Sequence, residues 1–206
     1  MTDPTLYAMP SSGNSYKARL LLALTGRRCR VVPLEAGSDA LAAAQADGTL
    51  PFGTTPALHL PDGTILSESG AILWHFGAGT AFVPADPLDQ ARMLAWMFFE
   101  QNRHEPVIAV RAALRCYPHR AAEATPARMA DLLDRGHAIL AVMEAALADS
   151  PWFGGTRPSL ADIALYGYTH SAAARGGFEM DRFPAVLGWC DRIADLPGHV
   201  PQDPAA

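Results

Sequence analysis

The chain has 206 residues, enough for one large domain or two small ones with a sizeable core. Its formal net charge of -5 and its scattered arginines argue against nucleic acid as a partner, because phosphate binding needs clustered basic side chains. No run of about 18 apolar residues occurs, so we expect no membrane span. The N-terminus lacks the basic and apolar regions of a signal peptide, which favours a cytoplasmic protein.

Cysteine and histidine are too dispersed to suggest a metal site. Cys29, Cys116 and Cys190 are far apart and include no Cys-x-x-Cys pair. An odd number of separated cysteines indicates reduced thiols rather than a disulfide framework or a zinc site, and we expect each to be a small buried residue. The His-Glu-Pro run at 104–106 lacks the second histidine that a zinc-binding helix needs, so no metal is expected.

Strand and helix patterns alternate over the first 78 residues. The predicted elements are strand 5–8, helix 15–25, strand 30–34, helix 39–46, strands 57–60 and 64–66, and a helix that begins at Glu68 and ends near residue 76. Gly26 is a typical stop for the first helix, and Asp62-Gly63 between apolar runs indicates a hairpin. The order β-α-β-α-β-β-α is that of a thioredoxin-like domain.

The rest of the chain is predicted to be helical. Residues 79–87 have the Gly and Pro content of a linker between a domain at 1–78 and a second domain at 88–206. The second domain should contain a long helix at 88–117, with Pro106 as the place for a kink, and a last helix at 183–196. Between them an apolar stripe follows helical spacing at Leu132, Gly136, Ile139, Leu140, Met143 and Leu147. The predicted fold class is therefore an α/β domain followed by an all-α helical bundle.

A capping box opens another helix of the second half. Ser159 stands three residues before Asp162, and an apolar run follows. The Ser159 hydroxyl would accept from a backbone amide of the first turn, while the Asp162 carboxylate reaches back to the N-cap amide. We interpret both residues as structural, with about 1 kcal/mol lost on removing the cap and more if it is buried.

Two stretches have the features of a ligand site. Thr55-Pro56 lies where a loop turns into a strand, and a proline there is a candidate for a cis peptide bond. Glu68 and Ser69 open a helix, whose unpaired first amides and positive dipole end can hold a carboxylate. Taken alone, the first is usually only a turn and the second only a helix start. Together they would hold opposite parts of one peptide-like molecule.

The order and spacing of the two stretches resemble the glutathione-binding half of the glutathione transferase family, and the resemblance covers nearly the whole chain. Bacterial members of the theta, zeta and nu type look most similar. The resemblance implies glutathione as a co-substrate and a homodimer. In the family, the residue before the cis-proline pairs through its backbone with the cysteinyl unit, and the Glu-Ser pair holds the γ-glutamyl end. The positions that match these contacts are Thr54, Thr55, Pro56, Glu68 and Ser69.

The turn after the first strand offers several groups that could stabilise the glutathione thiolate. Matching the theta and zeta patterns by resemblance selects Ser12, with Ser11 and Asn14 as alternatives and Tyr7 as a fourth by register. A hydroxyl at a helix N-terminus favours the anion through a hydrogen bond and the helix dipole. No cysteine lies in this turn, which disfavours a thiol-disulfide mechanism through a protein cysteine.

The implied function is that of a glutathione S-transferase in detoxification, which conjugates glutathione to a small apolar electrophile or uses it to reduce a peroxide. The electrophile would bind between the domains, and candidates on the long helix are Trp96, Phe99, Arg103, His104, Ile108, Arg111 and Tyr117. The alternative is a non-catalytic interaction module, a use of the same fold in translation factors and starvation-response proteins. Isomerisation of a maleyl compound is less favoured, because Ser12-Gly13-Asn14 replaces the Ser-Ser-Cys turn of zeta members.

Overall fold

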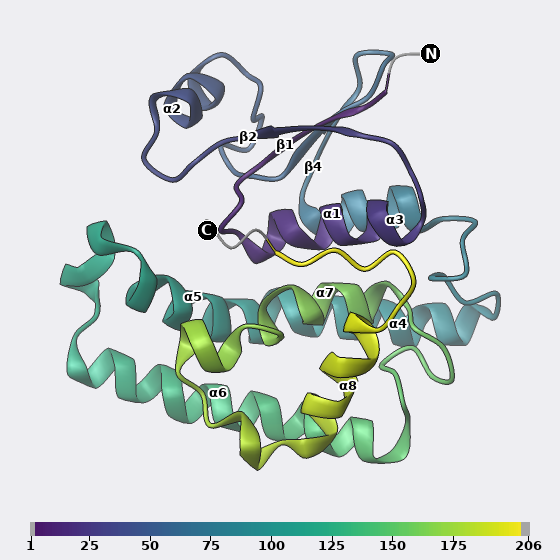
Figure 1. Cartoon of the computed structure of the whole chain (residues 1–206), viewed down its shortest axis with the longest axis vertical. Helices are drawn as coiled ribbons and strands as arrows, with labels where there is room; N and C mark the ends of the chain where they lie inside the picture. The colour runs from purple at the N-terminus through teal and green to yellow at the C-terminus, as the bar shows by residue number, and fades with distance from the viewer. Residues whose placement is uncertain (1–2, 203–206) are drawn as a thin grey trace. The chain divides into compact units, whose positions relative to one another are not determined.

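In a computed structural model of the protein, residues 3–202 are described, and the chain divides into two compact units (Figure 1). Of the described residues, the first unit contains 3–80 and also 194–202, whereas the second unit is Ala81–Ile193. The division near residue 80 falls in the predicted linker. The last residues differ from the predicted second domain, because from Ala194 on they group with the first unit.

The first unit has a thioredoxin-like fold. Its elements are β1 (Thr5–Ala8), α1 (Gly13–Leu24), β2 (Arg30–Pro33), α2 (Asp39–Ala46), β3 (Ala57–His59), β4 (Ile65–Ser67) and α3 (Ser69–Gly77). The predicted order is confirmed. The sheet has the strand order β2-β1-β3-β4, in which β1 is parallel to β2 and β3 is antiparallel to both β1 and β4.

Side-chain alternation gives this sheet two buried faces. Leu6 of β1 is opposite Leu58 of β3, and both are fully buried. Tyr7 is opposite Ala57 and packs on the other face in a cluster with Leu34, Leu41, Ala44, Leu50 and Ala57. In Figure 1, α1 and α3 lie side by side along one face, and α2 lies on the opposite side.

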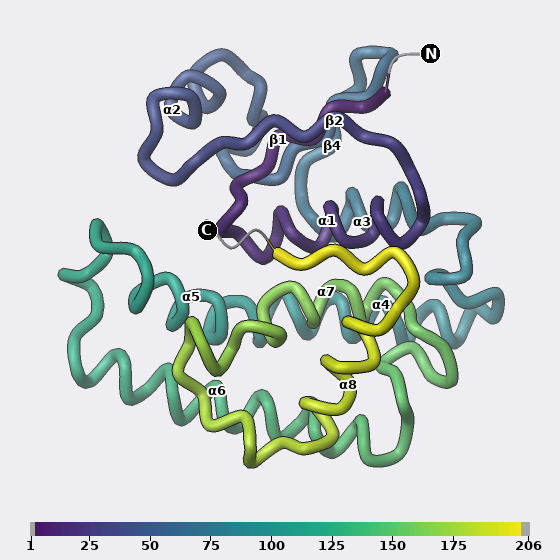
Figure 2. Tube along the Cα trace, viewed as in Figure 1, coloured from purple at the N-terminus to yellow at the C-terminus, as the bar shows by residue number. Residues whose placement is uncertain are grey.

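Helix α1 begins at Gly13, two residues before the predicted start, because Ser12 is its N-cap. The Ser12 Oγ accepts from the Ser15 amide at 3.4 Å. The predicted stop is confirmed, since the helix ends at Leu24 and Gly26 has a φ of 63°. The C-terminal stretch runs along this helix (Figure 2), where the Tyr16 hydroxyl donates to the Val200 carbonyl at 2.8 Å.

The second unit is helical throughout its named elements. They are α4 (Pro87–Phe99), the π-helical η1 (Glu100–His104), α5 (Glu105–Cys116), η2 (Pro118–Glu123), α6 (Pro126–Asp149), α7 (Leu160–Thr169), η3 (Ala172–Gly176), η4 (Met180–Arg182) and α8, which begins at Pro184 and runs to Ala194. On α6, all of the predicted stripe except Ile139 is buried. Within residues 3–202, no helix combines the length and the apolar character that a membrane crossing requires.

The predicted helix 88–117 is interrupted rather than merely kinked. A π-helical turn, Glu100–His104, separates α4 from α5 just before Pro106. Proline has no amide hydrogen and its ring crowds the carbonyl four residues earlier, so a regular α-helix cannot pass through it without distortion. The wider π turn absorbs this conflict while the chain stays helical.

The predicted capping box is present and lies in the core of the second unit. Asp162 is fully buried, and its carboxylate accepts hydrogen bonds from the Ser159 amide at 2.8 Å, the Ser159 hydroxyl at 2.9 Å, the Phe153 amide at 3.0 Å and the Trp189 indole at 2.9 Å. Burial raises the pKa of Asp162, and the hydrogen bonds oppose that shift. One carboxylate therefore joins the start of α7, the loop before it and α8.

We predict that Asp162→Ala destabilises the protein by about 3 kcal/mol or more, because several buried donors lose their acceptor at once. Chemical denaturation followed by circular dichroism measures the change. Asp149→Ala is the control, since Asp149 is exposed at the end of α6. Equal unfolding midpoints for the two variants would contradict the structural role of Asp162.

Candidate glutathione site

Three segments meet beyond one end of the strands because of how the strands are paired. Ala57 at the start of β3 is opposite Tyr7 near the end of β1 and opposite Ser67 at the end of β4. Since β3 is antiparallel to both neighbours, its first residue lies beside the last residues of the other two strands. Three segments therefore lie beyond the same ends of these strands: the turn after β1, the Thr55-Pro56 bond and the Glu68-Ser69 pair.

Ser12 and Ser11 differ in their surroundings within the turn after β1. Ser12 is half-buried, and its side chain caps α1 by accepting from the Ser15 amide. Capping uses a lone pair of the hydroxyl, so the hydroxyl hydrogen remains able to donate to another group. Ser11 is buried with 5 % of its surface exposed. Ser12 is thus the N-cap of α1, and the cap does not use its hydroxyl hydrogen.

The Thr55-Pro56 peptide bond is cis, as predicted from the sequence. Pro56 is buried, Thr55 is half-buried and Thr54 is exposed just before β3. Among residues 3–202, neither the backbone amide nor the backbone carbonyl of Thr55 forms a hydrogen bond. These two groups can therefore pair with an extended peptide in the manner of an added strand.

Glu68 has an unusual backbone conformation. Its φ of 71° is the only positive value of a non-glycine residue among residues 3–202. This region costs energy for an L-residue with a side chain, and such strain is concentrated at functional sites. Glu68 is the N-cap of α3 but makes no side-chain cap hydrogen bond, so the first amides of the helix are open to an anion.

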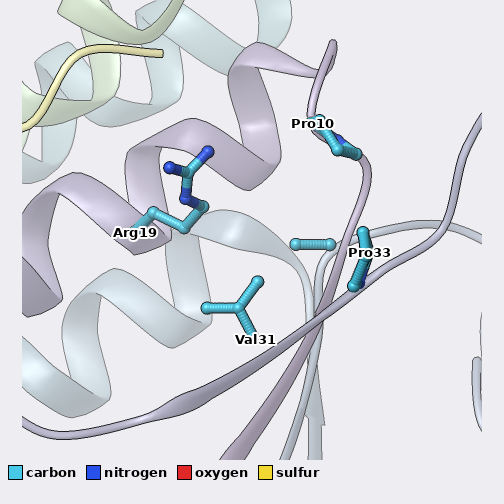
Figure 3. A pocket seen from close by; sticks show the side chains of 5 residues that line it. Pro10, Arg19, Val31 and Pro33 are labelled. Carbon is cyan, nitrogen blue, oxygen red and sulfur yellow. The ribbon is translucent and has the colours of Figure 1, made fainter. Parts of the chain in front are cut away.

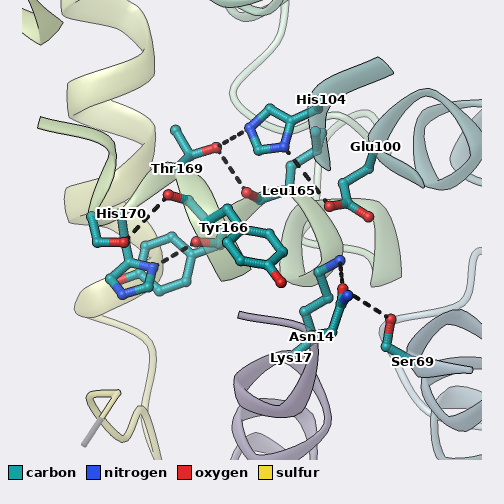
Figure 4. Close-up of polar contacts among 11 residues, drawn as sticks. Asn14, Lys17, Ser69, Glu100, His104, Leu165, Tyr166, Thr169 and His170 are labelled. Atoms are coloured by element: carbon teal, nitrogen blue, oxygen red, sulfur yellow. Dashed lines mark hydrogen bonds and ion pairs between the residues drawn. The ribbon is translucent and has the colours of Figure 1, made fainter. Parts of the chain in front are cut away.

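Ser69 and Asn14 connect the starts of α3 and α1. Ser69 is buried, and its hydroxyl donates to the Asn14 Oδ1 at 3.3 Å. The Lys17 ammonium donates to the same oxygen at 2.7 Å (Figure 4). The sequence-based reasoning selected Ser69 and Asn14 but missed Lys17. A signal was present, because the only lysine of the chain falls within the predicted helix 15–25.

Tyr7 faces away from the turn. Its ring belongs to the cluster on the second face of the sheet and lies 4.7 Å from the His59 ring, measured between centroids. Successive residues of a strand point to opposite faces, so Tyr7 cannot share the face of Leu6 and Ala8. The ring therefore acts in packing, which leaves Ser12, Ser11 and Asn14 as candidates for the thiolate.

The seven candidate electrophile residues are not gathered at one place in the helical unit. They extend over about 30 Å of helix, from Trp96 on α4 to Tyr117 at the end of α5. Trp96 packs against Phe153 with ring centroids 4.6 Å apart, and the Arg111 guanidinium donates to the carbonyls of Met129 and Gly176. These contacts hold Trp96 and Arg111 within the helical unit, and the assignment of the electrophile pocket to the seven residues stays a prediction.

His104 belongs to a buried polar chain of the same unit, drawn in Figure 4. Its Nε2 lies 2.9 Å from the Thr169 hydroxyl, which in turn donates to the Leu165 carbonyl at 2.8 Å. Because the single hydroxyl hydrogen is used on Leu165, the imidazole must donate to Thr169, which fixes the ring with a hydrogen on Nε2. The other ring nitrogen lies 3.8 Å from a carboxylate oxygen of Glu100.

Among the described residues, each unit has a small cavity of about 240 Å³. The cavity of the first unit is lined by Ala8, Pro10, Arg19, Val31 and Pro33. Figure 3 shows the Arg19 side chain of α1 near that of Val31 on β2. The cavity of the second unit lies against Trp96, Trp152 and Phe153. No cluster of three His, Cys, Asp or Glu residues suited to a metal occurs in the described part of the chain.

The fold defines a thioredoxin-like protein with an attached helical unit, and the candidate site lies beyond the ends of β1 and β4. Sequence profiles of two parts match it: glutathione S-transferase, N-terminal domain, at residues 6–79, and glutathione S-transferase, C-terminal domain, at residues 126–192. The chain belongs to the glutathione S-transferase family. The resemblance drawn from the Thr-Pro and Glu-Ser stretches is thereby confirmed.

Solved structures and curated relatives extend this similarity over nearly the full length. A glutathione S-transferase from Xanthobacter autotrophicus Py2 is 42% identical, covers 98% of both chains and has a TM-score of 0.88. A theta class enzyme from Xanthomonas axonopodis pv. citri, solved with glutathione bound, is 25% identical over 96% of this chain and 95% of that chain, with a TM-score of 0.85. The disulfide-bond oxidoreductase YfcG of Escherichia coli K12 is 27% identical over 93% of this chain and 90% of the relative.

The cysteines are less buried than expected. Cys116 is exposed at the end of α5, whereas burial raises the pKa of the half-exposed Cys29 and raises that of Cys190 to about 12. The prediction that each is a small buried residue is wrong for Cys116, which is exposed at the end of its helix, and holds only in part for Cys29 and Cys190, which are partly buried.

We predict that a thiol reagent at pH 8 reacts fastest with Cys116. A thiol with a pKa of about 12 has only about one molecule in ten thousand as thiolate at that pH, so Cys190 should react slowly. Its reaction should speed up as the pH rises. Absorbance kinetics with an aromatic disulfide measure the phases, and a fast phase that persists in Cys116→Ser would contradict this order.

Proposed function

We propose that the protein is a glutathione transferase that binds glutathione beyond the ends of β1 and β4 in its first unit. The observation that carries this proposal is Glu68, whose strained backbone opens α3 with uncapped amides next to the buried Ser69. Strain of this kind persists only where the surroundings enforce it, and here it presents a ready anion site. The relative solved with glutathione supports the choice of ligand.

Each end of the tripeptide has its own partner. Glu68 and Ser69 hold the γ-glutamyl group, through the α3 amides for its carboxylate and through the Glu68 side chain for its ammonium. Thr55, next to cis-Pro56, pairs with the backbone of the cysteinyl unit, and Thr54 flanks the glycyl end. The geometry supports this division because the three segments lie beyond the same ends of the strands.

The reaction depends on stabilising the glutathione thiolate. The thiol of an unperturbed cysteine has a pKa near 8.5, so only a few per cent is nucleophilic at neutral pH. Lowering the pKa by two units requires about 2.7 kcal/mol, which a charge-assisted hydrogen bond and a helix N-terminus can supply. Ser12 is at the N-cap of α1 with its hydroxyl hydrogen unused by the cap, whereas Ser11 and Asn14 are its rivals.

The thiolate attacks a small apolar electrophile in a conjugation or reduces a peroxide, and the protein acts as a cytoplasmic homodimer in detoxification. Large apolar side chains at the surface support an assembled state, since Phe52 is 66% exposed and Phe98 is 62% exposed. An activity panel of aryl halides, peroxides, disulfides and maleylacetoacetate-like compounds tests the proposal. Turnover of none of them, with glutathione bound, would favour a non-catalytic interaction module instead.

We predict that Ser69→Ala weakens glutathione binding by about 1 to 3 kcal/mol, because the γ-glutamyl carboxylate loses a donor. Isothermal titration calorimetry measures this loss. Ser38→Ala serves as a matched control, since Ser38 is likewise at the start of a helix of the first unit but caps α2. The assignment of Ser69 fails if its variant binds glutathione as tightly as the wild type.

We predict that Ser12→Ala damages the reaction more than binding. The ultraviolet absorbance of bound glutathione should show its thiol pKa moving up toward the free value, and kcat should fall while glutathione affinity changes little. The same measurements on Ser11→Ala and Asn14→Ala separate the rivals. If Ser12→Ala left the pKa and kcat unchanged while a neighbouring variant shifted them, the role would belong to that neighbour.

A further inference from the structure

Lys17 is the only lysine among the 16 Lys and Arg residues of the chain, and it is buried with 1% of its surface exposed. Lysine is almost never fully buried unless its ammonium is paired, because removing the charge from water is costly. Its known partner within the first unit is Asn14, one turn earlier on α1. A single buried lysine at this place points to a specific task.

Hydrogen-bond chemistry fixes the orientation of the Asn14 amide. The Lys17 ammonium has only hydrogens to donate, so the atom at 2.7 Å must be the amide oxygen and not the nitrogen. The Ser69 hydroxyl, 3.3 Å from that oxygen, must then also donate to it. One oxygen thus receives hydrogens from α1 and from the start of α3 (Figure 4).

We propose that Lys17 is a positioning residue of the glutathione site, acting through Asn14 on Ser69. This inference rests on the proposed function. Lys17 contacts Asn14, and Asn14 contacts the residue that opens the γ-glutamyl end of the site. Lys17 therefore prepares the anion site without touching the ligand.

The arrangement matters because Ser69 has a single hydroxyl hydrogen. In the structure this hydrogen is directed to Asn14, so it must turn to the γ-glutamyl carboxylate when glutathione binds. Lys17 keeps its hydrogen bond to the Asn14 oxygen while Ser69 turns away, so that oxygen retains a donor. Without Lys17, the amide oxygen and the carboxylate compete for the one hydrogen of Ser69, which weakens binding of the ligand.

Calorimetry on charge-matched variants tests the effect on affinity. Lys17→Met, which keeps the length but not the donors, should bind glutathione about tenfold more weakly, whereas Lys17→Arg should remain within about threefold of the wild type. Arg28→Met is the control for lost positive charge, since its side chain is 87% exposed and faces Asp3. It should bind as the wild type does.

A double-mutant cycle tests whether Lys17 acts through Ser69. The combined variant, Lys17→Met with Ser69→Ala, should lose less affinity than the product of the two single losses, because the second change removes an interaction already impaired. Independent, multiplicative losses would overturn the proposed path. The cycle also separates positioning from general destabilisation, which would not depend on Ser69.

The single lysine allows a direct measurement on the unaltered protein. In protein labelled with ¹⁵N at lysine, the side chain of Lys17 gives the only Nζ signal, and saturation with glutathione should shift it as Ser69 leaves Asn14. This result holds even if Lys17→Met fails to fold. If the wild type binds glutathione but the signal does not move, the inference fails alone. If the wild type binds none, the proposed function fails and the role of Lys17 fails with it.

Discussion

The pairing of β3 between β1 and β4 is the constraint on which the site depends. Ala57 is opposite both Tyr7 and Ser67, and this register places the start of β3 beside the ends of β1 and β4. A shift of one residue would turn every side chain of β3 to the other face, and Leu58 would leave the core. Burial of Leu6 and Leu58 therefore holds not only the sheet but also the segments that would bind a peptide.

Both units use buried charge in a similar way, although for different ends. In the helical unit the Asp162 carboxylate receives four hydrogen bonds and ties a loop and two helices together. In the first unit the Lys17 ammonium donates to Asn14 beside the start of α3. A buried charge is costly unless it is paired, so each of these side chains requires an ordered set of partners. In the first case the partners form a core, and in the second they border the proposed site.

Backbone conformation contributes as much to the candidate site as side chains do. Thr55 presents its own amide and carbonyl beside a cis peptide bond, and Glu68 opens α3 at a φ that other non-glycine residues of the described chain avoid. Groups of this kind recognise the repeating part of a peptide and its carboxylate rather than a particular side chain.

The sequence by itself determined the order of elements, the two site stretches and the capping box, because these depend on neighbours a few residues apart. Helix starts, glycine stops and the Asp-Gly hairpin are local signals of this kind. Only the tertiary structure decided the contact between Asn14 and Ser69, which are 55 residues apart, and with it the place of Lys17. It also decided the packing of the Tyr7 ring and the contacts that Trp96 and Arg111 make within the helical unit. Spacing along a chain shows which face a residue occupies, but the atoms that it meets are set by how distant segments pack.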